Sequence, residues 1–360
     1  MKDESPQRVG ILGAGQLALM LAQASERLDL EVLCAGQDGD CAEQAAPVLQ
    51  VELNRAAEVA AFAKRADLVT VESENIDASV LHGLELYPNA HAIGIAQDRL
   101  LEKRFFGQCG IQVAPFAAVD SLDDLKQALA QIGLPAILKT RRMGYDGKGQ
   151  VRLQHLEEAA GAWDAVDQVP SILEGMVRFD TEVSMIAVRG RTGDTAFYPL
   201  VENFHRDGIL RKSIAPYARA SELQEQAEAY LRVLLEQLEY VGVLTVEFFV
   251  QGERLIANEM APRVHNSGHW TIEGSVSSQF ENHLRAIAGL PLGSTESLPM
   301  VMLNCIGWMP PLAETEGCPS LLRHDYGKDP RPGRKVGHLT FPASAEKDIA
   351  EWEARLAQHG

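Results

Sequence analysis

The chain contains 360 residues, of which 46% are hydrophobic and 23% charged, and its formal net charge is −17 at pH 7. This length exceeds one typical core and predicts two or three folded domains with a cleft between them, and the composition excludes a disordered or fibrous chain. The negative charge is spread along the sequence and basic clusters are short, which argues against a nucleic-acid partner, since that needs a continuous basic surface.

Cysteine usage and apolar runs indicate a cytoplasmic protein. The five cysteines are odd in number and form no Cys-x-x-Cys pair, which disfavours a disulfide framework and a zinc site. No apolar run approaches the roughly 18 residues of a membrane-spanning helix, and the N-terminal segment lacks the basic-then-apolar pattern of a signal peptide. We therefore expect no membrane association.

Residues 8–95 alternate short apolar runs with helical stretches, which predicts a parallel, Rossmann-like α/β sheet. Its first turn runs from Gly13 to Ala18, where backbone N–H groups at a helix N-terminus can hold a phosphate. Glycines also permit tight packing of a strand against a helix, so both interpretations stay open. A dinucleotide is disfavoured because Asp38 comes late after the second strand.

A small α/β unit follows, and beyond it the pattern becomes that of antiparallel strands with a long helix. Helices are expected at residues 96–108, 122–132, 155–166 and 220–239 and from Ser344 onward, and strands in FAAV, at 135–139, and in QVRL, SILEG, EVSMIAVRG, TAFYPLVEN, GILRKSIAP, VLTVEFFV, RLIANEMAP and KVGHLTF. We predict three domains, 1–112, 113–178 and 179–360.

Lys139 ends an apolar strand and precedes a loop with glycines at 144, 147 and 149. Glycines let backbone N–H groups approach anionic oxygens, and a lysine beside them offsets phosphate charge, so we predict a phosphate clamp. The alternative is a solvated hairpin with some basic residues. A second lysine, Lys148, and the pair Tyr145-Asp146 inside the glycines favour the clamp.

Glu247 and Glu259 lie twelve residues apart on two apolar strands joined by a short turn. A hairpin would bring both acids to one face if the turn length fits. With Asn258 they offer the hard oxygen ligands that Mg²⁺ prefers. Surface glutamates are the alternative, but an unpaired charge among apolar residues would be costly. Arg263, His265 and Asn266 follow directly, which favours catalysis at this place.

Glu174 and Glu182 are weaker candidates. They could hold the amine of adenine and the ribose hydroxyls, with the backbone of Met176 and Val177 contacting the base, but ordinary salt bridges would explain either glutamate equally well.

At these residues the chain resembles the ATP-grasp superfamily and, within it, is similar to the N5-carboxyaminoimidazole ribonucleotide synthetase (PurK) family. The segments that carry the resemblance span nearly the whole chain: GILGAGQLALM, TVESEN, QDRLLEKRFF, YDGKGQ, YPLVENFHRDGILRKSIAP, NEMAPRVHNSGHWT and RPGRKVGH. It implies an ATP-grasp fold, with an N-terminal Rossmann-like domain, a small central lid domain and a C-terminal domain with a largely antiparallel sheet.

The resemblance also implies an activity, ligands and a dimer. The reaction would be ATP-dependent carboxylation of 5-aminoimidazole ribonucleotide by bicarbonate, through carboxyphosphate, in purine biosynthesis. ATP would contact Arg99, Lys139, Gly144, Tyr145, Asp146, Gly147, Lys148, Gly149, Gln150, Glu174, Gly175, Met176, Val177, Glu182, His205, Asn258 and Glu259. The metal, Mg²⁺ or Mn²⁺, would bind Glu247 and Glu259, and a homodimer is expected.

Further residues would serve the other substrates. By the same resemblance, Tyr145, Asp146 and Lys148 would contact the ribonucleotide and the carboxylating species. Arg263 and His265 would lie close to bicarbonate. The ribonucleotide would be held by Gln16, Glu74, Lys328 and Arg334.

The sequence departs from the family at two places. Ala18 and Leu19 replace a glycine and an arginine, which puts part of the phosphate contact in question, and Lys148 stands where arginine is common. Another ATP-grasp ligase, such as formate-dependent glycinamide ribonucleotide transformylase, and a non-enzymatic ATP-binding sensor remain alternatives.

Overall fold

The computed structural model describes residues 6–77, 79–144 and 148–359, and the described strands form three sheets. The N-terminal sheet is parallel, in the order β3-β2-β1-β4, as the alternation of apolar runs predicted. Its elements are β1 (Gln7–Leu12), α1 (Gln16–Ser25), β2 (Leu30–Gly36), a 3₁₀ helix (Cys41–Gln44), β3 (Val48–Gln50), α2 (Ala56–Ala63) and β4 (Leu68–Val71).

Two helices, not one, connect this sheet to the next. The helix expected at 96–108 is α4 (Arg99–Gln108), and a further helix that was not expected, α3 (Ala90–Ala96), precedes it after a short break. The break occurs because the side chain of Asp98 accepts hydrogen bonds from the amides of Leu100 and Leu101, at 3.0 and 3.2 Å, and so caps a new helix.

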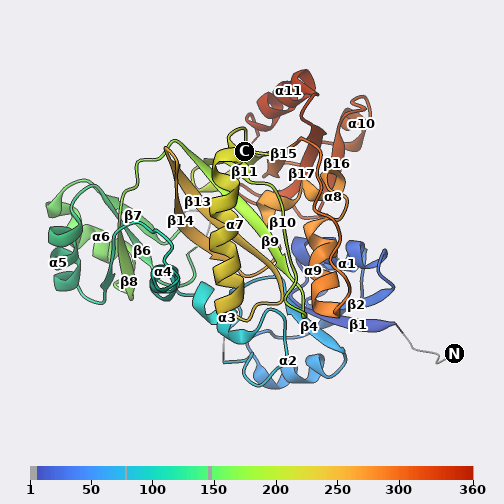
Figure 1. Ribbon diagram of the computed structural model, residues 1–360, viewed down its shortest axis with the longest axis horizontal. Coiled ribbons are helices and arrows are strands. Elements are labelled where there is room, and N and C mark those ends of the chain that lie inside the picture. Colours follow the sequence, from blue (N-terminus) through green and yellow to red (C-terminus); the bar gives the residue numbers. More distant parts are fainter. Residues whose placement is uncertain (1–5, 78, 145–147, 360) are drawn as a thin grey trace.

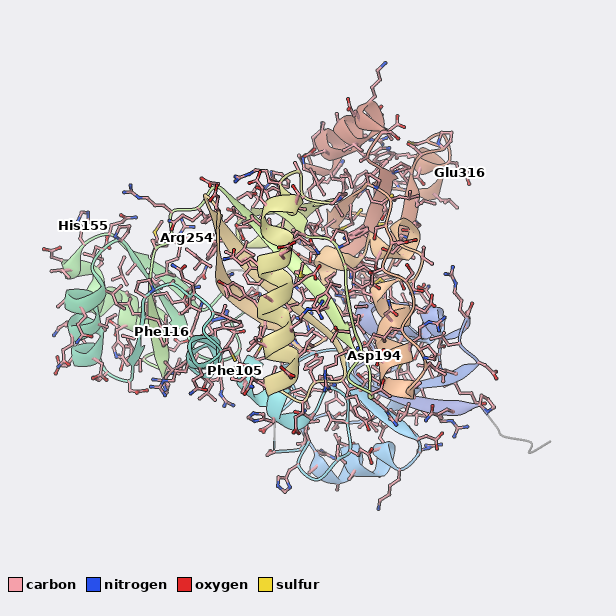
Figure 2. All side chains as sticks on the ribbon, viewed as in Figure 1. Phe105, Phe116, His155, Asp194, Arg254 and Glu316 are labelled. Carbon is pink, nitrogen blue, oxygen red and sulfur yellow. The ribbon has the colours of Figure 1, made fainter. Side chains whose placement is uncertain are left out.

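The central unit is a four-stranded antiparallel sheet in the order β5-β8-β6-β7, with α5 and α6 on one side (Figure 1). Its elements are β5 (Phe116–Val119), α5 (Leu122–Ile132), β6 (Ala136–Thr140), β7 (Gln150–Leu153), α6 (Ala159–Ala165) and β8 (Ser171–Gly175). The helix expected at 155–166 is shorter, because its first turn is a separate 3₁₀ helix (Leu156–Glu158). In Figure 2, Phe105 marks α4 between this unit, where Phe116 and His155 are labelled, and the rest of the molecule.

The largest sheet is antiparallel, in the order β14-β13-β9-β11-β12-β15-β17-β16, with β10 paired to β9. Its strands are β9 (Thr181–Arg189), β10 (Thr195–Phe197), β11 (Val201–Arg206), β12 (Ile209–Ala215), β13 (Gly242–Gln251), β14 (Arg254–Ala261), β15 (Met300–Ile306), β16 (Leu322–Asp325) and β17 (Lys335–Pro342). The helices are α7 (Ala220–Gln237), α8 (Thr271–Gly274), α9 (Gln279–Ala288), α10 (Leu312–Thr315) and α11 (Glu346–Leu356), with a 3₁₀ helix at Asn266–Gly268. The segment TAFYPLVEN, expected as one strand, is divided between β10 and β11.

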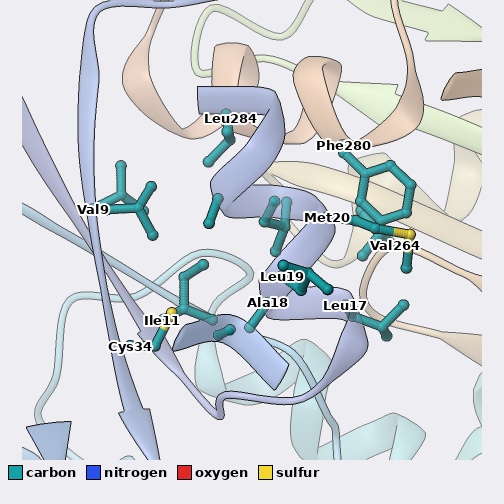
Figure 3. Close-up of a cluster of buried hydrophobic side chains, with 14 of the residues drawn as sticks. Val9, Ile11, Leu17, Ala18, Leu19, Met20, Cys34, Val264, Phe280 and Leu284 are labelled. Atoms are coloured by element: carbon teal, nitrogen blue, oxygen red, sulfur yellow. The ribbon is translucent and has the colours of Figure 1, made fainter. Parts of the chain in front are cut away.

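The N-terminal sheet and the largest sheet share a hydrophobic core through α1 and α9 (Figure 3). Ala18 and Leu19 are 0% and 2% exposed there, packed in the same cluster as Phe280 and Leu284 of α9. The two departures from the family pattern therefore belong to a packing surface. Within the described residues, every helix is too short or too polar to cross a membrane.

Candidate active site

A cavity of about 850 Å³ is lined by residues of the central and the largest sheet, together with α1 and the segment that follows β4 in the N-terminal part of the chain. Of the residues predicted from sequence, those that line it are Gln16, Glu74, Arg99, Lys139, Gly144, Gln150, Glu174, Gly175, Met176, Val177, Glu182, His205, Glu247, Asn258, Glu259, Arg263 and His265. Tyr145, Asp146 and Gly147 lie outside the described residues. Residues far apart in the sequence thus converge on one space.

Lys139 and Glu174 form an ion pair in one wall of the cavity. Their strands, β6 and β8, are antiparallel neighbours, and Nζ of Lys139 lies 3.0 Å from Oε2 of Glu174. Burial alone would raise the pKa of Glu174, but the ammonium groups of Lys103 and Lys139 lower it to about 2. The carboxylate of Glu174 is therefore ionised, and its Oε2 is engaged by the two lysines. Met176 donates its amide to Pro135 O, so only its carbonyl remains for a base.

Arg99 of α4 holds the described start of the glycine loop. Arg99 donates from Nη2 to Gly144 O at 2.9 Å, and its amide donates to Arg141 O. At Gly149, φ is +69° and a Cβ atom would lie 2.7 Å from Oγ1 of Thr140, so this position requires glycine. Lys148 is exposed. The described part of the loop thus approaches its neighbours as closely as its glycines predicted.

Glu247 and Glu259 face each other across the β13–β14 hairpin because β14 contains a bulge. Phe248 pairs with Ala257, and continuing that register would pair Glu247 with Asn258. The register instead shifts by one residue, so that Glu247 pairs with Glu259. Burial, and then the charge of Glu259, raise the pKa of Glu247 to about 7.

Two further groups surround Glu247. Ligand atoms of Glu182, His205 and Glu247 all lie within 4.8 Å of one another, and Nδ1 of His205 is 3.1 Å from Oε2 of Glu182. On the other side, Nη1 of Arg99 is 3.7 Å from Oε2 of Glu259. The carboxylates thus lie near cationic or protonatable groups. Among the described residues, those close enough to hold a metal together are Glu182, His205 and Glu247, a group that does not include Glu259. The sequence had assigned Glu182 and His205 to ATP alone.

His265 is held in one tautomer. The amide of Ser267 donates to Nδ1 of His265 at 3.3 Å, and Oγ of Ser267 lies 2.9 Å from the same nitrogen. Burial and the nearby charge of Arg263 lower the pKa of His265 well below its ordinary value. The neutral ring therefore carries its proton on Nε2, which lies 3.2 Å from Oε1 of Glu247.

Where the cavity borders the N-terminal part of the chain, Arg263 forms a bidentate ion pair with Glu74. Its Nη2 donates to Oε1 of Glu74 at 3.0 Å. Lys328 contacts the side-chain oxygen of Gln16, which lines the cavity, while Arg334 donates to Asp329 O at 3.2 Å. Burial and then the charge of Arg334 help to lower the pKa of Lys328. The predicted substrate residues therefore gather at one end, although Lys328 and Arg334 do not line the cavity themselves.

The N-terminal glycine turn contains an acid that the sequence interpretation did not anticipate. Oε1 of Glu72 accepts from Gly15 N at 2.7 Å, and Oε2 accepts from Ala18 N at 3.0 Å. A Cβ atom on Gly13, whose φ is +120°, would lie 2.2 Å from the side chain of Glu72. The turn thus accommodates an internal carboxylate in the place considered for a ligand phosphate.

Sequence reasoning also missed Glu102 and Lys103 of α4, whose side chains contact β14 and Glu174. The only indication in the sequence was a run of three charged residues, Glu102, Lys103 and Arg104, between apolar residues, and only the first two are buried.

Known protein families match this chain along nearly its whole length, from residue 7 to residue 351. Three family models match in order: a ribonucleotide synthetase preATP-grasp domain at residues 7–97, an ATP-grasp domain at 104–280, and a phosphoribosylaminoimidazole carboxylase C-terminal domain at 300–351. The N5-carboxyaminoimidazole ribonucleotide synthase of Pseudomonas aeruginosa is 46% identical over 98% of both chains.

Solved structures are equally similar. The N5-carboxyaminoimidazole ribonucleotide synthetase of Thermus thermophilus matches with a TM-score of 0.91 at 50% identity, covering 98% of both chains. The N5-carboxyaminoimidazole synthase of Aspergillus clavatus, in complex with ADP and 5-aminoimidazole ribonucleotide, matches with a TM-score of 0.90 at 28% identity, covering 98% of this chain and 99% of that one.

Proposed function

The chain belongs to the N5-carboxyaminoimidazole ribonucleotide synthase family of ATP-grasp ligases, and from this membership we propose that it carboxylates 5-aminoimidazole ribonucleotide, using ATP and bicarbonate. This is a step of purine biosynthesis. The observation that carries the proposal is the convergence on one cavity of the Lys139–Glu174 pair, the Glu247–Glu259 pair and the Arg263–Glu74 pair.

The proposed reaction has two steps. An oxygen of bicarbonate attacks the γ-phosphorus of ATP, and the bond to ADP breaks, which gives carboxyphosphate and ADP. The amine nitrogen of the ribonucleotide then attacks the carboxyl carbon, the bond to phosphate breaks, and the amine loses a proton. A cavity closed to water protects the carboxyphosphate from hydrolysis before the amine reacts.

ATP would lie between the central unit and the largest sheet. Lys139 and Arg99 offset the phosphate charge, and Gly144, Gly147, Gly149 and the rest of the loop up to Gln150 offer backbone N–H groups. Gly175, the carbonyl of Met176 and the backbone of Val177 line the base, while Glu182 and His205 bind the ribose or phosphate end. Glu174 contributes by holding Lys139 in place.

The acids of the hairpin fit a divalent cation. Glu247 and Glu259 are paired in register, and the charge of Glu259 raises the pKa of Glu247, a repulsion that a cation between them would relieve. Mg²⁺ or Mn²⁺ would be held by these two carboxylates, with Asn258 adjacent, and when bound would neutralise phosphate charge.

The remaining predicted residues would act on the other two substrates. Arg263 and neutral His265, which donates from Nε2, would bind bicarbonate and carboxyphosphate. Tyr145, Asp146 and Lys148 would cover the reacting groups. Glu74 would orient the imidazole, and Gln16, Lys328 and Arg334 would hold the ribonucleotide phosphate, with Lys328 acting as a point charge.

Three broader expectations remain proposals with it: the three domains 1–112, 113–178 and 179–360, a cytoplasmic location, and a homodimer.

A coupled assay for ADP release tests the function. We expect release that needs Mg²⁺, bicarbonate and 5-aminoimidazole ribonucleotide together, with glycinamide ribonucleotide plus formate as the matched comparison. Equal ADP release without any ribonucleotide, or faster release with glycinamide ribonucleotide and formate, would overturn the proposal.

The metal assignment is tested by Glu259→Gln, which keeps the size of the side chain and removes its charge. Turnover should be largely abolished and Mn²⁺ binding to the enzyme–ADP complex strongly weakened, while the circular dichroism spectrum stays unchanged. Near wild-type turnover in this variant would remove Glu259 from the metal site.

A further inference from the structure

The bulge on β14 leaves backbone groups that β13 does not pair. Because Phe248 pairs with Ala257 and Glu247 with Glu259, Asn258 is the extra residue on β14. A bulged residue interrupts the ladder and needs other partners when it is buried. β14 is also the last strand of its sheet. At its outer edge Ala257 forms an isolated bridge with Val113, and Ala257 N donates to Gln112 O at 2.8 Å, so the backbone groups beyond Ala257 still need partners.

Two consecutive side chains of α4 supply those partners. Nζ of Lys103 donates to Asn258 O at 2.7 Å and to Ala257 O at 3.4 Å. Oε1 of Glu102 accepts from Met260 N at 2.7 Å. The backbone on both sides of Glu259 is therefore held by α4, whose side chains lie 155 and 158 positions earlier in the sequence.

Lys103 also reaches the opposite wall of the cavity. Its Nζ lies 3.7 Å from Oε2 of Glu174, the same oxygen that lies 3.0 Å from Nζ of Lys139. Glu102 and Lys103 are 2% and 1% exposed, and burying two ionisable side chains this deeply is costly unless specific contacts offset it. The other buried side chains of α4, Leu100, Phe105 and Phe106, are apolar.

We propose that Glu102 and Lys103 are positioning residues for the metal and nucleotide site: together they hold the β14 bulge that places Glu259 opposite Glu247, and Lys103 also holds Glu174 beside Lys139. Neither side chain needs to contact ATP or metal for this role. The inference rests on the proposed function, in which Glu247 and Glu259 hold the divalent cation.

A positioning role and a purely structural role of Glu102 and Lys103 predict different effects on metal affinity and on the melting temperature. If the two side chains set the position of Glu259, their loss weakens metal binding more than it weakens the fold. If they only stabilise the packing of α4, their loss lowers the melting temperature and leaves the metal affinity of the folded enzyme unchanged.

The experiment measures Mn²⁺ binding to the enzyme–ADP complex by electron paramagnetic resonance of free Mn²⁺, beside thermal unfolding and steady-state kinetics. The test variants are Lys103→Met and Glu102→Met, which keep an unbranched side chain and remove the polar contacts. The matched conservative variant is Glu102→Gln, whose amide oxygen can still accept from Met260 N. The controls on the same helix are Arg104→Met, which removes an exposed charge, and Phe105→Leu, which weakens packing.

We expect Lys103→Met and Glu102→Met to raise the Mn²⁺ dissociation constant about tenfold or more, a size typical for partners that orient a metal ligand. The apparent KM for Mg·ATP should also increase. Its fold increase should be larger than the fold decrease in kcat measured at saturating metal. Glu102→Gln should remain within about twofold of the wild type. Phe105→Leu should lower the melting temperature without changing Mn²⁺ affinity.

Wild-type Mn²⁺ affinity in folded Lys103→Met would overturn the inference. If that variant does not fold, equal affinities in Glu102→Met and Glu102→Gln overturn it on their own, and a tenfold difference between them supports it. Unchanged Mn²⁺ affinity in Glu259→Gln would instead overturn the metal assignment, and with it the inference that depends on it.

Discussion

Two glycine-rich turns border the same cavity and are used in opposite ways. In the N-terminal turn, Gly13 and Gly15 make room for the carboxylate of Glu72, which accepts hydrogen bonds from backbone amides. In the loop that begins at Gly144, the glycines approach Arg99 and Thr140, and the adjacent charge is the ammonium of Lys139. The first turn holds a carboxylate of the protein, and we propose that the second binds the phosphates of ATP.

The comparison shows what a run of glycines can and cannot predict. Glycine indicates that something approaches the backbone closely, but not whether that group is a ligand or a side chain. The two nearby acids differ accordingly. Burial raises the pKa of Glu72, whose hydrogen-bond partners are neutral amides, whereas Lys103 and Lys139 outweigh burial and lower the pKa of Glu174.

The largest expected effect, on kcat/KM for ATP, concerns Lys139 beside the loop that begins at Gly144. Lys139→Met removes an ammonium group beside the phosphate site, and at about 4 Å such a charge pair is worth roughly 4 kcal/mol near a surface, or about a thousandfold in kcat/KM for ATP. Steady-state kinetics would measure this. Lys126→Met, an exposed lysine on α5 of the same unit, is the matched control. A loss below about tenfold would mean that Lys139 does not serve the phosphates.

A smaller effect should distinguish Glu174 from Glu72 in how the free energy of unfolding depends on pH. The pKa of Glu174 is lowered from 4.5 to about 2, so its contribution is fully present above pH 4.5 and is lost as the pH falls towards 2. The full shift corresponds to about 3 kcal/mol. Glu174→Gln should flatten this acid dependence in urea unfolding, whereas Glu72→Gln should not, because the pKa of Glu72 is shifted upward. An equally steep dependence in wild type and Glu174→Gln would contradict the ion pair.

The smallest expected effect concerns the N-terminal glycine turn, which accommodates the side chain of Glu72. Glu72→Ala removes the acceptor of two backbone amides, and hydrogen bonds to a charged group contribute about 2 kcal/mol, so the melting temperature should fall by a few degrees. The KM for ATP should stay within about twofold of the wild type, because Glu72 holds the turn and not the nucleotide. A raised KM with an unchanged melting temperature would reverse the assignments of the two turns.

Much of the fold followed from local patterns. Period-two and helical spacing predicted the parallel N-terminal sheet and α5, which occupies the expected residues Leu122–Ile132. The helix expected from residue 96 begins only at Arg99, because the side chain of Asp98 caps it, and α3 before it was not expected. The helix α9 also went unpredicted, although Ser278 caps it.

The candidate site was predicted in its residue types and only partly in its arrangement. Lys139 was identified as a lysine that ends a strand before a glycine loop, Glu247 as an acid inside an apolar strand, and Arg263 by its place just beyond Glu259. All three line the cavity. Glu72 was not identified, because nothing in its neighbourhood along the sequence states that it reaches Gly15. The partners of Glu174 were equally hidden, since Lys103 comes from a different unit of the chain.

The sequence by itself determined the family, the order of the elements and the chemical groups of the site, because those depend on local spacing and on residue types. Only the tertiary structure decided which acids face each other. Equal spacing along two strands would have placed Asn258, not Glu259, opposite Glu247, and the bulge that corrects this has its backbone groups paired by Glu102 and Lys103 from α4. Register at that point is fixed by buried hydrogen bonds between distant segments, and no local pattern encodes them.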